Sequence, residues 1–338
     1  MARAVLEIDA DAIRQNIKAI RNFSGKRVIA VVKADAYGIG AMHICPILET
    51  LDEVSSFAVA CVEEAIELRK AGIKKDILIL GGVFKGERKA LVEYALTPVV
   101  SHEAHLKAIE GLDIGFHVKY DTGMGRLGFF EDVLIKDKRV KGVLTHLSSP
   151  LDKDFSLGQI EKFKRIVKAY SNVYVHLESS AGVVYKVPFA THVRIGLAMY
   201  GEKPAPDYPI ELKRAISIKA RILSVKYLPP SYPVSYSRTF ITDRKKKVGV
   251  VAFGYADGLA KALSNVGCLY WKDRPLRILG NITMDMTMVD LDDTDAQVGD
   301  EVEIIGPHQS FSHLAKLAGT IPYEIMCHLS SRIKRVVV

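Results

Sequence analysis

Residues 28–33 read Val28-Ile29-Ala30-Val31-Val32-Lys33, a run of five apolar residues that ends in a lysine. Continuous apolar runs of this kind are typical of strands in parallel sheets, because such strands are covered on both faces. Similar runs recur along the first two-thirds of the chain, at Ser56–Ala60, Ile77–Leu80, Thr97–Val100, Ile114–Tyr120, Val140–Leu144, Val173–Leu177 and Thr191–Ile195.

Segments with helical spacing separate several of these runs. Ile13, Ile17 and Ile20 recur at i, i+4 and i+7, and either Asp9 or Asp11 is placed to cap that helix. Alternation of strands and helices predicts a parallel sheet with right-handed crossovers. Eight such repeats predict an α/β fold of the closed (β/α)8 TIM-barrel type rather than an open sheet.

A proline-rich stretch marks the end of the predicted barrel, since six of the 13 prolines lie between residues 204 and 233. Residues 216–222 alternate apolar and polar side chains as a half-buried antiparallel strand does. Further strands are expected at Val248–Phe253, Leu276–Leu279, Thr287–Leu291 and Glu301–Ile305, with one helix capped by Ser312. We therefore predict a barrel over residues 8–214 and a mainly β domain over 215–338. Residues 1–7 lie outside the predicted barrel and are compatible with the β domain.

Composition narrows the class of protein. The chain has 338 residues, 49% hydrophobic and 25% charged, as expected of a globular protein. Its net charge is +8, but basic and acidic residues are interleaved and the densest basic run, Arg244–Lys247, is short. We therefore expect no nucleic-acid partner. We also expect no membrane partner, because no stretch of the sequence approaches the roughly 18 apolar residues that a membrane span needs. The four cysteines form no Cys-x-x-Cys pair, which favours a cytoplasmic protein with free thiols and no metal site.

Active sites of such barrels lie at the carboxyl ends of the strands. Lys33 ends the first strand and is a candidate Schiff-base nucleophile, although a surface lysine has the same pattern. His146 follows the sixth strand and is either a base or a structural hydrogen-bonding group.

Three glycines after the fifth strand, Gly123, Gly125 and Gly128, match G-x-G-x-x-G formally. A dinucleotide site is disfavoured, because that motif opens the first βα unit and leads into a helix. We expect these glycines to allow a tight turn that presents Arg126 to a carboxylate.

Small residues follow the seventh and eighth strands, at residues 179–182 and 196–201, where barrels commonly bind phosphate. In the β domain, Tyr255 lies in a turn between two glycines and is either a core aromatic residue or a proton donor and acceptor. Met284 and Asp285 lie in a candidate loop whose default interpretation is core packing.

Taken in order, these segments resemble the alanine racemases. The matching motifs are Val32-Lys-Ala-Asp-Ala-Tyr-Gly38, Asp121-Thr-Gly-Met-Gly-Arg-Leu-Gly128, Thr145-His146, Ser179-Ser-Ala181, Arg194-Ile-Gly-Leu-Ala-Met-Tyr-Gly201, Gly254-Tyr-Ala-Asp-Gly258 and Met284-Asp285. Each motif is weak alone, but the ordered set covers nearly the whole chain. The resemblance implies an N-terminal (β/α)8 barrel, a C-terminal β domain, pyridoxal 5'-phosphate as cofactor, and interconversion of L- and D-alanine that supplies D-alanine for peptidoglycan.

The resemblance also implies catalytic roles. Lys33 would hold the cofactor covalently and act as one base, and Tyr255 would be the other base, supplied by the partner subunit of a homodimer with shared active sites. Two bases on opposite faces are required because one removes the α-proton and the other returns it from the far side. Arg194 would contact the pyridine nitrogen, and His146 would link Arg194 to Tyr255 and help set the ionisation of the tyrosine.

The remaining implied roles concern binding. The residues expected around the cofactor and its phosphate are Tyr37, Ser180, Gly196, Leu197 and Tyr200. Arg126, Met284 and Asp285 would bind the substrate, with the carboxylate held by Arg126 and Met284. Lys119 matches a lysine that is often carbamylated in the family, and a carbamate there would orient Arg126.

Some residues depart from the family pattern. Ile39 replaces a common histidine, Ser179 a common asparagine, and Ser331 and Lys334 stand where some members carry tyrosine and proline. These changes leave open a racemase of another small amino acid. The alternatives are a pyridoxal-phosphate decarboxylase, whose Glu-Pro-Gly-Arg motif is absent here; a cofactor-binding regulatory barrel, which lacks a β domain; and a cofactor-free Schiff-base aldolase, which needs neither the second domain nor Arg194.

Overall fold

A computed structural model describes residues 2–338 of the chain, which divide into two compact units. The barrel unit consists of Ile13–Ala36 and Ala41–Lys213, and the β unit consists of residues 2–12, Tyr37–Gly40 and Arg214–Val338. Met1, which was grouped with residues 1–7 above, lies outside the described residues.

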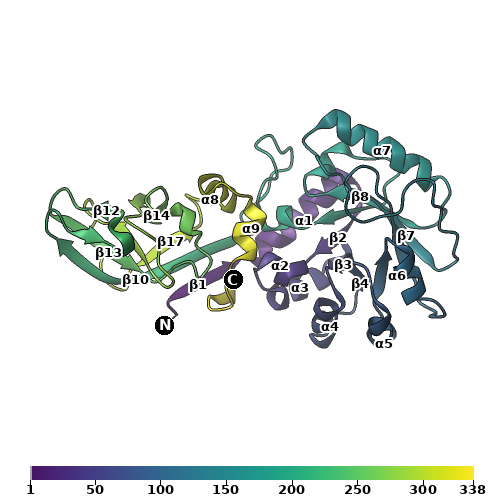
Figure 1. Ribbon diagram of the computed structural model, residues 1–338, viewed down its shortest axis with the longest axis horizontal. Coiled ribbons are helices and arrows are strands. Elements are labelled where there is room, and N and C mark those ends of the chain that lie inside the picture. The colour runs from purple at the N-terminus through teal and green to yellow at the C-terminus, as the bar shows by residue number, and fades with distance from the viewer. Residues whose placement is uncertain (1) are drawn as a thin grey trace. The chain divides into compact units, whose positions relative to one another are not determined.

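Eight parallel strands of the barrel unit form a closed barrel (Figure 1). They are β2 (Arg27–Val31), β3 (Val54–Val59), β4 (Asp76–Ile79), β5 (Thr97–Val100), β6 (Phe116–Lys119), β7 (Val140–Leu144), β8 (Tyr174–Ser179) and β9 (His192–Ile195). The barrel closes where β2 pairs in parallel with β9. The predicted (β/α)8 barrel is therefore confirmed, and each predicted strand overlaps one observed strand.

Helices cover the outside of the barrel strands (Figure 1). The longer ones are α1 (Ala10–Ser24), α3 (Ala41–Glu49), α4 (Val62–Lys70), α5 (Arg88–Glu93), α6 (Glu103–Ala108) and α7 (Lys153–Val167), and short helical turns are α2 (Lys33–Tyr37), η1 (Lys85–Glu87), η2 (Gly182–Tyr185) and η3 (Leu197–Tyr200). Helix α1 illustrates why they pack there, because Ile13, Ile17 and Ile20 are fully buried. Asp9 caps this helix by accepting a hydrogen bond of 2.8 Å from the backbone N–H of Ala12.

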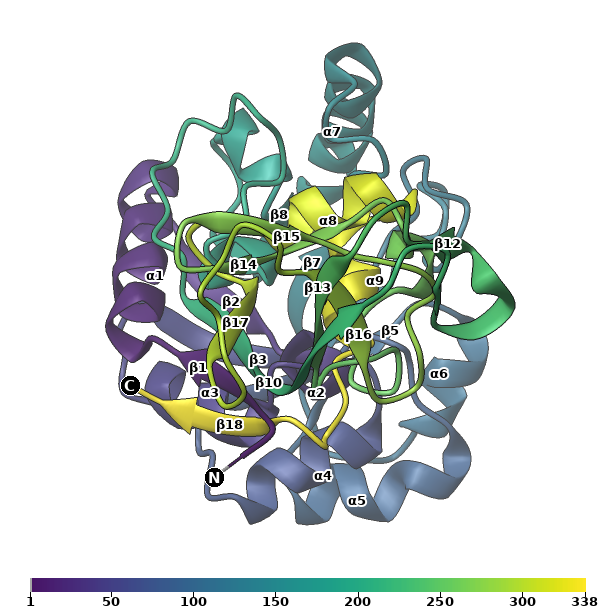
Figure 2. The same ribbon diagram turned by 90° about the vertical axis from the view of Figure 1, so that its left-hand side faces the viewer.

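The β unit is built on one mostly antiparallel sheet. Its strands are β1 (Ala4–Ile8), β10 (Ile216–Leu228), β13 (Lys246–Val251), β14 (Cys268–Trp271), β15 (Arg274–Arg277), β16 (Thr287–Asp290), β17 (Glu301–Ile305) and β18 (Lys334–Val337). Strand β1 lies between β10, to which it is antiparallel, and β18, to which it is parallel (Figure 2). The unit also contains a small ribbon of β11 (Pro233–Val234) and β12 (Phe240–Ile241) and the turns η4 (Tyr236–Arg238) and η5 (Lys261–Leu263). The predicted mainly β domain is therefore confirmed.

The helical part of the β unit differs from the expectation. Two helices are present, α8 (Phe311–Ala318) and α9 (Pro322–Cys327), where one was predicted. The N-cap of α8 is Ser310 rather than Ser312, since the Ser310 hydroxyl accepts a 3.0 Å hydrogen bond from the N–H of His313. Proline at the first position of α9 needs no hydrogen-bond partner there and starts the helix. No helix formed by residues 2–338 is both long and apolar enough to cross a membrane.

Candidate active site

Most of the predicted barrel residues lie at the carboxyl ends of the strands. Lys33 follows β2, Lys119 ends β6, and His146 follows β7. Ser180 follows β8, and Arg194 lies near the end of β9. Because parallel strands of a closed barrel all end on the same rim, the fold brings these five residues to one end of the barrel.

The segment after Lys33 is a left-handed turn. The φ angles of Ala34, Asp35 and Ala36 are 53, 51 and 55°, and that of Tyr37 is 60°. A left-handed conformation costs a residue with a side chain roughly 1–2 kcal/mol, so the surrounding contacts have to hold it. One such contact is a 3.0 Å hydrogen bond from the Tyr200 hydroxyl to the carbonyl of Ala36. Tyr200 thus supports the lysine turn in addition to any role toward a cofactor.

Arg194 is the best-defined group of the site. Its Nη1 donates to Nδ1 and to the carbonyl of His176, and its Nη2 donates to the carbonyl of Thr145 and to Nδ1 of His146, at 2.7–3.0 Å. These bonds account for four of the five guanidinium N–H groups. Among residues 2–338, no hydrogen bond is made by the fifth, the Nε–H. The burial of Arg194 lowers the pKa of its guanidinium to about 10, so it remains a cation at neutral pH.

The hydrogen bonds of Arg194 fix the neighbouring histidines. Burial, and then the charge of Arg194, lower the pKa of His146 well below its usual value, so this ring is neutral. Nδ1 of His146 accepts from Arg194, and its hydrogen therefore sits on Nε2. His176 is neutral for the same reasons and donates from Nε2 to Nδ1 of His117, 2.9 Å away. Sequence reasoning missed His176, although a polar residue within an otherwise apolar strand was a usable signal.

Lys119 is buried within a positively charged surrounding. Its burial, followed by the charges of Arg126 and Arg194, lowers the pKa of its amine to about 8. A large fraction of this amine is therefore neutral near pH 8, which is the form that reacts with carbon dioxide. This chemistry fits the predicted carbamate.

The glycine-rich loop after β6 is held by its own aspartate. Asp121 accepts hydrogen bonds from the N–H groups of Gly123, Met124 and Arg126 at 2.7–3.0 Å. The backbone donors that would bind a nucleotide phosphate are thus already occupied by a carboxylate, and the loop presents Arg126 at the surface.

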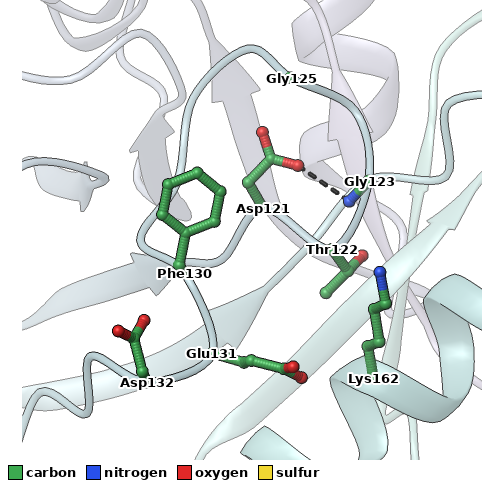
Figure 3. A pocket seen from close by; sticks show the side chains of 8 residues that line it. All are labelled: Asp121, Thr122, Gly123, Gly125, Phe130, Glu131, Asp132 and Lys162. Atoms are coloured by element: carbon green, nitrogen blue, oxygen red, sulfur yellow. Dashed lines mark hydrogen bonds between the residues drawn. The ribbon is translucent and has the colours of Figure 1, made fainter.

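The same loop borders a pocket of about 550 Å³ (Figure 3). Figure 3 shows Asp121 directed at Gly123, and the lining also includes Glu131, Asp132 and Lys162. Three carboxylates against one amine disfavour a phosphate, and none of the predicted cofactor-binding residues lines this pocket. No group of three or more His, Cys, Asp or Glu in residues 2–338 is placed to hold a metal ion.

The predicted phosphate residues of the barrel unit lie together at the ends of β8 and β9. The Ser180 hydroxyl accepts long hydrogen bonds of 3.3 Å from the N–H groups of Gly196 and Ala198. The N–H of Leu197 has no protein acceptor within residues 2–338. Backbone donors gathered around a hydroxyl suit a phosphate, and the free Nε–H of Arg194 suits a pyridine nitrogen, so these residues fit pyridoxal phosphate.

Tyr37 belongs to the β unit, where its ring packs 5.7 Å from that of Tyr323. Burial raises the pKa of its hydroxyl, which therefore keeps its proton and can donate a hydrogen bond.

Tyr255 and Met284 occupy two turns of the β unit that pair with each other. The N–H of Tyr255 donates to the carbonyl of Thr283 at 3.0 Å, and the N–H of Ala256 donates to that of Met284 at 2.9 Å. A Cβ atom on Gly254 would come within 2.4 Å of these carbonyls, so the close approach requires glycine. Tyr255 and Met284 are 45% and 53% exposed, which leaves both available to a second molecule.

Arg332 ties the same two turns together. Its Nε lies 3.3 Å from a carboxylate oxygen of Asp257, and its Nη2 lies 2.7 Å from one of Asp285. Asp257 in turn accepts a 2.9 Å hydrogen bond from the N–H of Gly254. Asp285, predicted as a substrate residue, is thus engaged by a cation, and sequence reasoning missed Arg332 because nothing local marks a partner so distant in the chain.

Comparisons with known proteins agree with this arrangement. The family models for the alanine racemase N-terminal domain and C-terminal domain match residues 8–204 and 215–337. An alanine racemase of Aquifex aeolicus is 62% identical over the whole of both chains, and that of Aquifex pyrophilus is 60% identical over 100% of this chain and 99% of its own. A solved structure of alanine racemase from Bartonella henselae with covalently bound pyridoxal phosphate has a TM-score of 0.91 at 30% identity, with full coverage of both chains.

Proposed function

The chain belongs to the alanine racemase family, and we propose that it interconverts L- and D-alanine with pyridoxal 5'-phosphate as cofactor. When bound, this cofactor withdraws electrons from the α-carbon of an attached amino acid and makes its α-proton acidic. The observation that carries the proposal is the Nε–H of buried Arg194, which makes no hydrogen bond within residues 2–338 although the other four N–H groups are all engaged.

Arg194 sets the electronics of the reaction. Its Nε–H donates a hydrogen bond to the pyridine nitrogen but cannot transfer its proton there, because a guanidinium in this site keeps its charge. The ring stays a weaker electron sink than a protonated pyridine, which favours simple proton return over side reactions. The work of removing the α-proton therefore falls on the two bases.

Those bases are Lys33 and Tyr255 of the partner subunit. Lys33 holds the cofactor covalently at rest and moves a proton on one face of the α-carbon, and the tyrosine hydroxyl moves a proton on the other. His146 is neutral and carries its hydrogen on Nε2, so it acts toward the tyrosine oxygen as a donor.

Binding groups complete the site. The phosphate is held by the hydroxyl groups of Tyr37 and Ser180 and by the N–H groups of Gly196 and Leu197, with Tyr200 supporting the lysine turn. The substrate carboxylate is held by Arg126, oriented by a carbamate on Lys119, and by Met284 of the partner subunit.

The homodimer and a cytoplasmic location are parts of the same proposal. The exposure of Tyr255 and Met284 supports a shared site, because a catalytic tyrosine has to be covered by another surface to exclude water. The four cysteines are free thiols, as in reducing compartments.

The test is a panel of L-amino acids incubated with the purified protein and pyridoxal phosphate, followed by chiral separation of the products. We expect L-alanine to become racemic fastest, with L-serine slower and bulky residues inert. Release of amines would identify a decarboxylase instead, and an unchanged panel would overturn the proposal.

A further inference from the structure

The carboxylate of Glu64 joins the turn after Lys33 to the neighbouring strand. Its Oε1 accepts a 2.7 Å hydrogen bond from the N–H of Ala34, and its Oε2 accepts one of 2.7 Å from the N–H of Ala60. Ala34 is the first residue of the left-handed turn, and Ala60 directly follows β3. One side chain thus fixes the chain just beyond the carboxyl ends of two adjacent strands, β2 and β3.

Only one of these two bonds resembles helix capping. Glu64 is the third residue of α4, and a glutamate there commonly reaches back to the backbone at the start of its own helix. The bond to Ala60 is a variant of this pattern shifted by one residue, since Ala60 directly precedes the N-cap Cys61. The other carboxylate oxygen accepts a hydrogen bond from Ala34, which lies 30 positions earlier in the chain, and helix capping does not require such a bond.

The bond to Ala34 bears directly on Lys33. The N–H of Ala34 belongs to the peptide group that joins it to Lys33, so holding this group fixes the ψ angle of Lys33 and the direction in which its side chain leaves the backbone. The following residues are strained, with φ between 51 and 60°, and would relax if the peptide were released. The carbonyl of Val32, the carboxylate of Asp35 and the Tyr200 hydroxyl hold later parts of the turn.

We propose that Glu64 is a positioning residue for Lys33 and that it holds the lysine ready for covalent capture of the cofactor. In that capture the amine nitrogen of Lys33 forms a C=N bond with the aldehyde carbon of pyridoxal phosphate, and the aldehyde oxygen leaves as water. The inference rests on the proposed function, because it takes Lys33 as the residue that is modified. Glu64 touches neither reactant and acts through the backbone.

The test compares Glu64→Gln with Glu63→Gln as a matched control. Glu63 is the exposed neighbour on the same helix turn and makes no bond to the lysine turn. Glutamine at 64 can accept one of the two N–H groups but turns its own N–H2 toward the other. Capture is followed from the apo protein by mixing it with pyridoxal phosphate, reducing at timed intervals with borohydride, and quantifying modified Lys33 by mass spectrometry.

We expect capture to be about tenfold slower in Glu64→Gln, which corresponds to about 1.4 kcal/mol, and unchanged in Glu63→Gln. Amide hydrogen exchange of the apo protein should show faster exchange at Ala34 in the first variant only. Ala34→Gly should restore much of the lost rate in the Glu64→Gln background, because glycine adopts the left-handed conformation without strain.

Capture at the wild-type rate in Glu64→Gln, or equal slowing in Glu63→Gln, would overturn the inference. Failure of the wild-type protein to be modified at Lys33 would instead overturn the proposed function. If Lys33 is not modified, the inference is still tested by amide hydrogen exchange. An exchange rate at Ala34 that is the same in Glu64→Gln as in the wild-type protein would overturn the inference as well.

Discussion

Nη2 of Arg194 lies 2.8 Å from Nδ1 of His146, and this contact determines which nitrogen of the histidine carries its hydrogen. An arginine can only donate, so Nδ1 is the acceptor and Nε2 is protonated. The histidine is therefore a neutral hydrogen-bond donor throughout the range in which the enzyme is expected to work.

This tautomer gives the first prediction. Burial, followed by the charge of Arg194, lowers the pKa of His146 well below its usual range, so its ring should be neutral at neutral pH and stay neutral as the solution is made mildly acidic. In ¹⁵N spectra of histidine-labelled protein, Nδ1 should keep a pyridine-like shift and Nε2 a pyrrole-like shift. His308 is the internal contrast, because its bond to Glu303 raises its pKa and it should lose its proton only above the usual range. Titration of His146 near neutrality would contradict the assignment.

The second prediction concerns the carbamate on Lys119. Only a neutral amine attacks carbon dioxide, and the pKa of about 8 means that this form grows as the pH rises through 8. At constant dissolved ¹³CO2, a protein carbamate signal should therefore increase over that range. The signal should vanish in Lys119→Met and remain in Lys141→Met, where the exposed lysine of β7 is removed.

Loss of the carbamate should also weaken substrate binding. A hydrogen bond to a charged group contributes about 1.5–3 kcal/mol, so Lys119→Met should raise KM for alanine by about 10- to 100-fold. Steady-state kinetics with and without bicarbonate check the cause. A bicarbonate-dependent KM in Lys119→Met would show that some other lysine carries the effect.

How far the sequence predicts the fold depends on how local the signal is. The bounds of β5 and β7 were predicted without error, because each is a short segment that contains several β-branched residues and lies between turns. Strands β1 and β18 were not predicted, since β1 pairs with β10 more than 200 residues away and with β18 near the other end of the chain. No local pattern reports such a pairing.

The residues of the site likewise differ in how far the sequence predicts them. Lys33 and His146 follow strands whose ends the apolar runs define, and Arg194 lies near the end of another, so their convergence could be predicted. The left-handed turn after Lys33 could not, because Ala34 and Asp35 carry none of the glycine signal that marks such backbone. Glu64 was missed because its function depends on a contact and not on its place in a motif.

The third prediction concerns Arg332 in the β unit. Arg332→Gln removes its ion pairs with Asp257 and Asp285 and loosens the turns that carry Tyr255 and Met284. We expect kcat/KM to fall about tenfold, whereas the free energy of unfolding should change by less than about 1 kcal/mol because Arg332 is exposed.

A double-mutant cycle identifies the partner. Asp285→Asn should lower kcat/KM only slightly further once Arg332→Gln is present, since both changes break the same ion pair. Arg274→Gln, at an exposed arginine of β15, is the control and should leave kcat/KM unchanged. Additive losses in the cycle would mean that Arg332 does not act through Asp285.

The central claim is that Lys33 and Tyr255 work on opposite faces of the α-carbon, and Tyr255→Phe isolates one face. Overall kcat/KM cannot distinguish the faces. The equilibrium constant between the enantiomers is fixed, so kcat/KM must fall by the same factor in the L-to-D and the D-to-L direction. Exchange of the α-hydrogen can, since a single base is enough to remove a proton and return a deuteron on the same side.

The most direct measurement is therefore α-hydrogen washout by ¹H NMR in D2O, with L-alanine and D-alanine supplied separately to Tyr255→Phe loaded with pyridoxal phosphate. We predict that D-alanine loses its α-hydrogen through Lys33 without racemising, while L-alanine exchanges at least about 100-fold more slowly than with the wild-type protein. Equal loss of exchange for the two enantiomers would contradict the two-base account.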